Sequence, residues 1–118
     1  MRLFTFDASS GHHVDRFGSN FVLAPLTDPT GMARVACMHL EPGGLIGEHE
    51  AVGGQLFCVV SGRGWVSGDE GERQPITAMQ AAFWDNGELH AAGTDEGLVA
   101  VVLEGSFTPW ARELAADR

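Results

Sequence analysis

The chain has 118 residues, of which 44% are hydrophobic and 19% are charged, and this balance predicts one globular domain over residues 1–118 rather than a disordered chain. Sixteen acidic residues against seven basic ones, all of them Arg, give a net charge of -9. This charge argues against nucleic acid or an anionic membrane as a partner, because both require positive charge. The absence of Lys and Tyr excludes Schiff-base chemistry on a lysine and proton transfer by a tyrosine.

Short apolar runs alternate with glycine-containing turns along most of the chain. Residues 17–23 predict a turn that leads into a strand, and residues 28–31, Asp-Pro-Thr-Gly, predict a second turn. The strands expected after it are rich in Val, Leu, Phe and Ala and cover residues 33–40, 55–60, 64–67, 81–84 and 98–103. Pro109 lies at the start of residues 109–115 and predicts a short C-terminal helical turn there.

Turn signals recur about every ten residues, and no sustained helical period lies between them. This spacing is typical of an all-β fold, either an antiparallel sandwich or a barrel. The two cysteines, Cys37 and Cys58, each lie in an apolar run without a CxxC pattern, so we expect buried, reduced thiols. The N-terminal apolar patch is too short for a signal peptide, and we therefore expect a soluble, cytoplasmic protein.

Two histidines far apart in the sequence each follow a glycine-containing turn. Residues 43–62, GGLIGEHEAVGGQLFCVVSG, contain His49 and Gln55, and residues 85–94, DNGELHAAGT, contain His90. Alternate residues of a strand face the interior of a barrel, so side chains from neighbouring strands can converge there.

The first of these segments resembles the first motif of the cupin superfamily. That motif is a Gly, five residues, a His, one residue, a second His, three or four residues, a Glu, six residues and a Gly. Four positions of this chain fall on its spacing: Gly43, His49, Gln55 and Gly62. Two ligand positions differ, because Ala51 stands in place of the second His and Gln55 in place of the Glu.

The second segment resembles the second cupin motif, which is Pro, one residue, Gly, two residues, His, three residues and Asn. Its positions read Asp85, Gly87, His90 and Thr94. The resemblance covers about residues 32–104 and implies an antiparallel jelly-roll β-barrel of six to eight strands. It also implies a divalent transition metal, such as Zn, Fe, Mn or Ni, bound by His49, Gln55 and His90. An amide oxygen carries no charge, so this set predicts a lower affinity than a full cupin site, or no metal.

Three carboxylates remain candidates to complete the site. Glu88 is two residues before His90 and would share its face on a regular strand, whereas Glu48 and Glu50 flank His49 and would point the other way. A different register of the motif would put Glu48 and Glu50 in the places of the two histidines. We prefer the register through His49, since Gly43 then fits as well.

The remaining site predictions concern proton transfer and the pocket wall. His39 lies on the strand before the first motif, and if it points inward it is a metal ligand or a general base. His39 or Glu88 could then move a proton. Three aromatic residues are expected to form the wall of a small-molecule pocket: Phe57, Trp65 and Trp84.

The resemblance implies a metal-binding cupin that binds or acts on a small organic molecule in the barrel. As an enzyme it would be an isomerase, cyclase, lyase or dioxygenase. The alternative is a non-catalytic small-molecule-binding or sensing cupin without a metal. Small barrels of this kind have edge strands that are hidden by pairing, so we also expect a homodimer.

Overall fold

A computed structural model describes residues 1–115, except for the side chain of Phe21. The strands of this part are β1 (Arg2–Thr5), β2 (His12–Val14), β3 (Phe21–Leu23), β4 (Met32–Leu40), β5 (Leu45–Glu50), β6 (Gly54–Ser67), β7 (Gln74–Thr77), β8 (Gln80–Trp84), β9 (Leu89–Gly93), β10 (Leu98–Ser106) and β11 (Arg112–Glu113). Two short 3-10 helices, η1 (Ala8–Ser10) and η2 (Arg16–Gly18), flank β2. Within these residues, no helix has the length and hydropathy that crossing a membrane requires.

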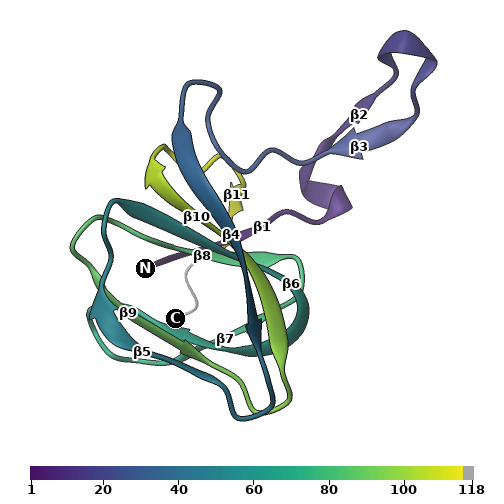
Figure 1. Cartoon of the computed structure of the whole chain (residues 1–118). Helices are drawn as coiled ribbons and strands as arrows, with labels where there is room; N and C mark the ends of the chain where they lie inside the picture. Colours follow the sequence, from purple (N-terminus) through teal and green to yellow (C-terminus); the bar gives the residue numbers. More distant parts are fainter. Residues whose placement is uncertain (116–118) are drawn as a thin grey trace.

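The strands close into a barrel from which the β2–β3 ribbon projects (Figure 1). In the part of the chain that is described, nine strands form one hydrogen-bonded sheet, with the order β11-β1-β8-β6-β10-β4 and with β5, β7 and β9 attached through β6. Each described strand pair is antiparallel, so the predicted all-β antiparallel architecture is confirmed.

Strand β6 turns a corner of the barrel. Its first half pairs with β8 and β10, and its second half pairs with β7 and β9. Gly62 lies at the corner with a φ of +80°, and a Cβ there would collide with the carbonyl oxygen of Gly97. The sequence predicted two separate strands over residues 55–60 and 64–67. The glycine at the bend instead lets one strand continue and change partners.

Both faces of the sheet are covered by apolar side chains, in the alternation expected of strands. The face toward the barrel interior includes Phe57, Val59, Ala82, Trp84, Ala100 and Val102. The opposite face includes Phe4, Leu56, Cys58, Ala81, Phe83 and Leu103. Strand β6 contributes to both clusters, which is why its first half reads as a nearly continuous apolar run.

The C-terminal helical turn predicted after Pro109 is wrong. Arg112 and Glu113 form β11, which pairs with Thr5 and Phe4 of β1, and the amide of Leu114 donates to the carbonyl oxygen of Leu3. The free edge of β1 satisfies these backbone groups, whereas a helix of so few residues is marginal in water.

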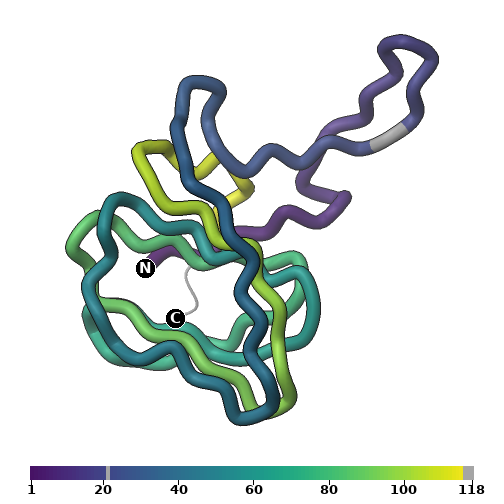
Figure 2. The backbone as a smooth tube through the Cα atoms, viewed as in Figure 1, coloured from purple at the N-terminus to yellow at the C-terminus, as the bar shows by residue number. Residues whose placement is uncertain are grey.

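Two parts of the fold, the edge strand β4 and the β2–β3 ribbon, are exposed to solvent. Strand β4 pairs with β10 on one side and has no partner strand on its other side among the described residues. It exposes Met32 and Val35, which are 76% and 60% accessible. The tube in Figure 2 shows the β2–β3 ribbon extending away from the barrel. Phe17 lies in η2 between these two strands and is 98% exposed.

Candidate metal centre

The structure brings His49 of β5 and His90 of β9 together. They are direct partners in the antiparallel ladder, and their ring centroids are 4.2 Å apart with the ring planes at 56°. His90 is 1% exposed, whereas His49 is exposed. The pair therefore extends from a deep position in the barrel to its opening.

A β-bulge in β5 gives His49 its direction. Ile46 pairs with Ala92 and His49 pairs with His90, so three steps along β5 match two steps along β9. The extra residue lets Ile46 and His49 line the same cavity, although a regular strand would send them to opposite faces. Glu48 and Glu50 are exposed and do not line the cavity, which leaves the alternative motif register without support.

Backbone carbonyls orient both imidazoles. The Nδ1 atom of His49 is 2.7 Å from the carbonyl oxygen of Gly47, and Nδ1 of His90 is 3.4 Å from that of Glu88. An Nδ1–H group that donates to a carbonyl leaves Nε2 as the acceptor. Nε2 of His90 is buried and has no hydrogen-bond partner among the described residues. An unsatisfied buried acceptor costs about 1–3 kcal/mol, so this atom is suited to an external partner.

Burial also affects the protonation of His90. It lowers the pKa of His90 below its ordinary value, because the imidazolium loses its hydration. The hydrogen bond to the carbonyl of Glu88 opposes this shift, and the nearby charge of His49 adds to it. The carboxylates of Glu104 and Glu88 oppose it more weakly. Neutral imidazole is the form that binds a metal.

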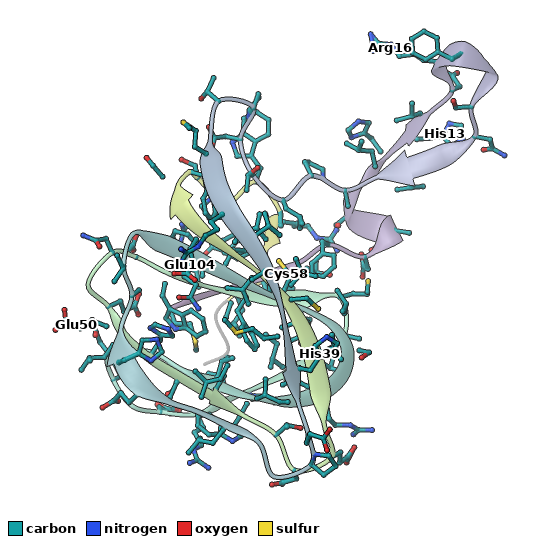
Figure 3. The ribbon with its side chains drawn as sticks, in the orientation of Figure 1. His13, Arg16, His39, Glu50, Cys58 and Glu104 are labelled. Atoms are coloured by element: carbon teal, nitrogen blue, oxygen red, sulfur yellow. The ribbon has the colours of Figure 1, made fainter. Side chains whose placement is uncertain are left out.

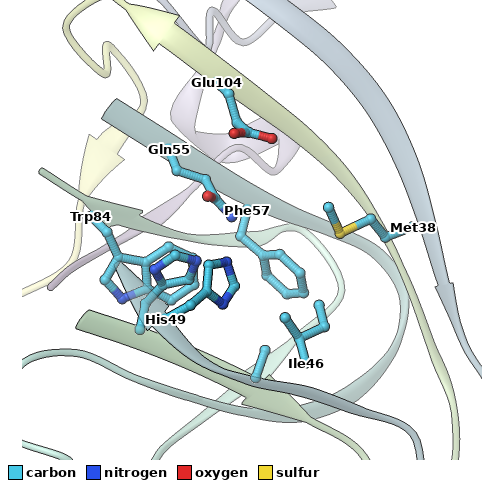
Figure 4. Close-up of a pocket in the computed structure, with 9 residues that line it drawn as sticks. Met38, Ile46, His49, Gln55, Phe57, Trp84 and Glu104 are labelled. Atoms are coloured by element: carbon cyan, nitrogen blue, oxygen red, sulfur yellow. The ribbon is translucent and has the colours of Figure 1, made fainter. Parts of the chain in front are cut away.

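The cavity beside the two histidines has a volume of about 70 Å³. Figure 4 shows the residues that line it, which are Met38, Ile46, His49, Gln55, Phe57, Trp84, His90, Ala92 and Glu104. Pockets for drug-sized ligands occupy roughly 300–1,000 Å³, so this cavity suits a ligand of a few heavy atoms. The three residues predicted as metal ligands all lie in its wall.

Comparison with known proteins identifies the fold. No protein-family model matches the sequence, and no curated protein matches it. A solved structure described as a predicted oxalate decarboxylase from Thermotoga maritima is 28% identical, with a TM-score of 0.58, over 63% of this chain and 67% of that chain. A cupin superfamily protein from Desulfitobacterium hafniense is 12% identical, with a TM-score of 0.59, over 71% of this chain and 76% of its own.

A third solved structure, a double-stranded β-helix domain protein from Klebsiella pneumoniae, is 22% identical, with a TM-score of 0.58, over 81% of this chain and 84% of its own. The chain folds as a cupin jelly-roll domain.

The position of the second histidine of the cupin motif lies in the barrel interior but carries no metal ligand. Ala51 stands where a full motif has its second His, and it is 3% exposed and packs in the interior core. Within residues 1–115, no three His, Cys, Asp or Glu side chains are grouped to hold a metal ion. The three residues predicted as ligands thus offer two imidazole nitrogens and the amide oxygen of Gln55, a set that suits a transition metal but carries no charge.

Sequence reasoning missed Glu104 of β10, which also lines the cavity. It is the direct ladder partner of Gln55. Ala100, Val102 and Glu104 alternate along β10 on the interior face, so the period of two contained the signal. The predicted strand ended at residue 103 and left Glu104 out.

His39 and Glu88 do not lie in the cavity. His39 is exposed on β4 (Figure 3). Its Nε2 is 3.6 Å from Sγ of Cys37. It borders a more open hollow of about 320 Å³, away from the histidine pair. Glu88 accepts hydrogen bonds from the amino group of Met1 at 2.6 Å and from the amide of Asp85 at 3.1 Å. Its backbone carbonyl, rather than its carboxylate, contacts His90.

Two of the three aromatic residues predicted for the pocket wall lie in the wall of the cavity. Phe57 and Trp84 line the cavity, but Trp65 is half-buried elsewhere, with the guanidinium of Arg73 3.8 Å from its ring centroid.

The two cysteines differ in burial. Cys58 is buried as expected, whereas Cys37 is exposed because it lies on the outer face of the edge strand β4.

Proposed function

We propose that this cupin binds a divalent transition metal through Nε2 of His49, Nε2 of His90 and the amide oxygen of Gln55. The centre then binds or acts on a small organic molecule in the cavity. The observation that carries the proposal is the buried Nε2 of His90, which has no partner among the described residues while Nδ1 faces a backbone carbonyl. Metal-binding histidines have this arrangement, in which the second ring nitrogen donates to a carbonyl or carboxylate.

A metal bound here would supply Lewis-acid chemistry to a ligand oxygen or a bound water. The chain's own residues supply the rest. The carbonyl oxygens of Gly47 and Glu88 fix the tautomers of the two histidines, and Trp84 and Phe57 exclude water from the inner wall. The likeness to a protein described as a predicted oxalate decarboxylase supports a small organic molecule as the ligand.

The second candidate is a small-molecule-binding or sensing cupin without a metal. Ala51 and Gln55 favour it, since two of the motif's ligand positions lack an imidazole or a carboxylate. The cavity would then offer two histidines and an amide as hydrogen-bonding groups in an apolar wall.

Metal binding to protein purified without a histidine tag separates the two candidates. We expect zinc uptake near one equivalent by elemental analysis, and a loss of affinity of at least about tenfold in His49→Ala and in His90→Gln. His39→Ala is the matched control and should bind zinc as the wild type does, because His39 lies outside the cavity. Less than about a tenth of an equivalent after incubation with Zn, Mn, Fe and Ni would favour the metal-free candidate.

We also propose that two copies of the chain pair through β4. A nine-residue edge strand with exposed apolar side chains is a template for pairing with another strand. Light scattering should give a dimer for the wild type and a monomer for Val35→Arg. Val52→Arg, at a 79% exposed position outside β4, should remain a dimer. A wild type that stays monomeric at high concentration would contradict the pairing.

A further inference from the structure

The cavity has a negative charge at one end. Glu104 is the one carboxylate among its lining residues, and the same lining contains no Arg. Glu104 lies opposite Gln55 in the β6–β10 ladder, and Figure 4 shows Gln55 between Glu104 and His49. A ligand in the cavity therefore meets the two histidines and this carboxylate in one wall.

Arg34, which forms an ion pair with Glu104, is exposed to solvent. Nη2 of Arg34 is 3.8 Å from Oε1 of Glu104, but the Arg34 side chain is 83% exposed and does not line the cavity. Ion pairs with one partner in water contribute little, because water screens the charge. The Glu104 side chain is itself only 27% exposed. An anion inside the cavity thus meets Glu104 with no buried protein cation to balance it.

Because the cavity is small, a ligand in it lies close to the charge of Glu104. The cavity of about 70 Å³ has the two histidines and Glu104 among its nine lining residues, so a ligand that fills it lies near both. Two charges separated by a few ångströms interact strongly where few waters screen them. The charge of a ligand should therefore affect its affinity for this cavity.

We propose that Glu104 sets the ligand specificity of the cavity. It accepts a hydrogen bond from an O–H or N–H group of a small uncharged organic molecule, and it repels small carboxylate anions. The inference rests on the proposed function, because it concerns the molecule bound beside His49 and His90. Glu104 acts on the ligand and not as a metal ligand, since within residues 1–115 it forms no three-residue group with the histidines.

Oxalate and oxamide test this, because they have the same heavy-atom skeleton but differ in charge. Oxalate is a dianion, and oxamide is neutral with N–H donors. Both are titrated by calorimetry into the zinc-loaded wild type and Glu104→Gln. We expect the variant to bind oxalate about tenfold or more tightly than the wild type, and oxamide several-fold less tightly. Glu50→Gln removes the same charge from an exposed side chain outside the cavity and should change both affinities by less than about twofold.

Zinc affinity is measured first, so that the two proposals fail separately. A wild type that binds no zinc contradicts the proposed function, and the titrations are then made on the metal-free protein. Opposite effects of Glu104→Gln on oxalate and oxamide still support the inference there, and binding of neither probe overturns it. An unchanged oxalate affinity also overturns it. A loss of zinc affinity beyond about a hundredfold in Glu104→Gln would make Glu104 a metal ligand and would likewise overturn it.

Discussion

The indole of Trp84 lies against the imidazole of His90, with ring centroids 4.6 Å apart and the ring planes at 31°. The indole is fixed in turn, because its Nε1–H donates to the carbonyl oxygen of Ser67 at 3.1 Å. All three residues are buried. The deep wall of the cavity is therefore held from β8 and β6 before any ligand enters.

Trp84→Phe tests this support. The substitution leaves the buried Ser67 carbonyl without its donor and leaves space beside His90, so we expect the free energy of unfolding to fall by about 1–3 kcal/mol. Zinc affinity should fall several-fold, because the His90 ring is less well fixed. Urea unfolding and zinc calorimetry measure the two effects. Trp110→Phe, at a 53% exposed position, should change neither. Equal stability of Trp84→Phe and wild type would show that the indole supports nothing.

Gln55→Glu restores the carboxylate of the cupin motif. We expect zinc affinity to rise at least about tenfold, since the new donor carries a charge. Without metal, the same carboxylate is buried opposite Glu104 and should lower the free energy of unfolding by about 1–3 kcal/mol. Relative to the wild type, Gln55→Glu should therefore have a higher melting temperature with zinc and a lower one without zinc. Gln74→Glu on β7 is the control. Unchanged zinc affinity would place the Gln55 amide outside the metal's reach.

Stability should depend on the protonation of His90. Burial lowers its pKa from the ordinary value of 6.5, so the unfolded chain takes up the proton at a higher pH than the folded chain. The contribution of His90 is complete above about pH 6.5 and is lost as the pH falls through the lowered folded pKa. We expect the free energy of unfolding of the metal-free protein to decrease from about pH 7.5 to pH 5.

His90→Gln is the comparison for this pH dependence and should have a shallower slope over the same range. The pKa values of Asp7 and Asp28 are also lowered, chiefly by hydrogen bonds from Ser9 and from the amide of Thr108. Their contributions have the same sign but are lost at more acidic pH. Identical slopes in the wild type and His90→Gln near neutral pH would exclude His90 as the cause.

The two thiols should differ in reactivity. Burial raises the pKa of Cys58 to about 12, so almost none of it is thiolate near neutral pH, whereas Cys37 is exposed. A disulfide reagent should titrate one thiol per native chain and a second one only after denaturation. Cys37→Ser should remove the fast reaction. Two rapidly reacting thiols in the native protein would contradict the burial of Cys58.

The positions of the barrel strands and of the histidine pair were predictable because they depend on local signals. Apolar runs between glycine turns gave β4, β6, β8 and β10, and the motif spacing pointed to His49 and His90. The face of His49 was not a local property. It depends on a bulge whose extra residue is defined only by pairing between β5 and β9.

Composition, charge and turn spacing by themselves determined an acidic, all-β chain, and the resemblance to the cupin motifs singled out its two imidazoles. Only the tertiary structure decided which oxygens join them. The Glu88 carboxylate accepts a hydrogen bond from the amino group of Met1, and Glu104, distant in sequence, lies opposite Gln55. The physical reason is that facing follows from the strand itself only where the strand is regular. The neighbours of a side chain, and its facing at a bulge such as that before His49, follow from which strands pair and in what register. The same reason made residues 112–113 a strand, because β1 had a free edge to offer.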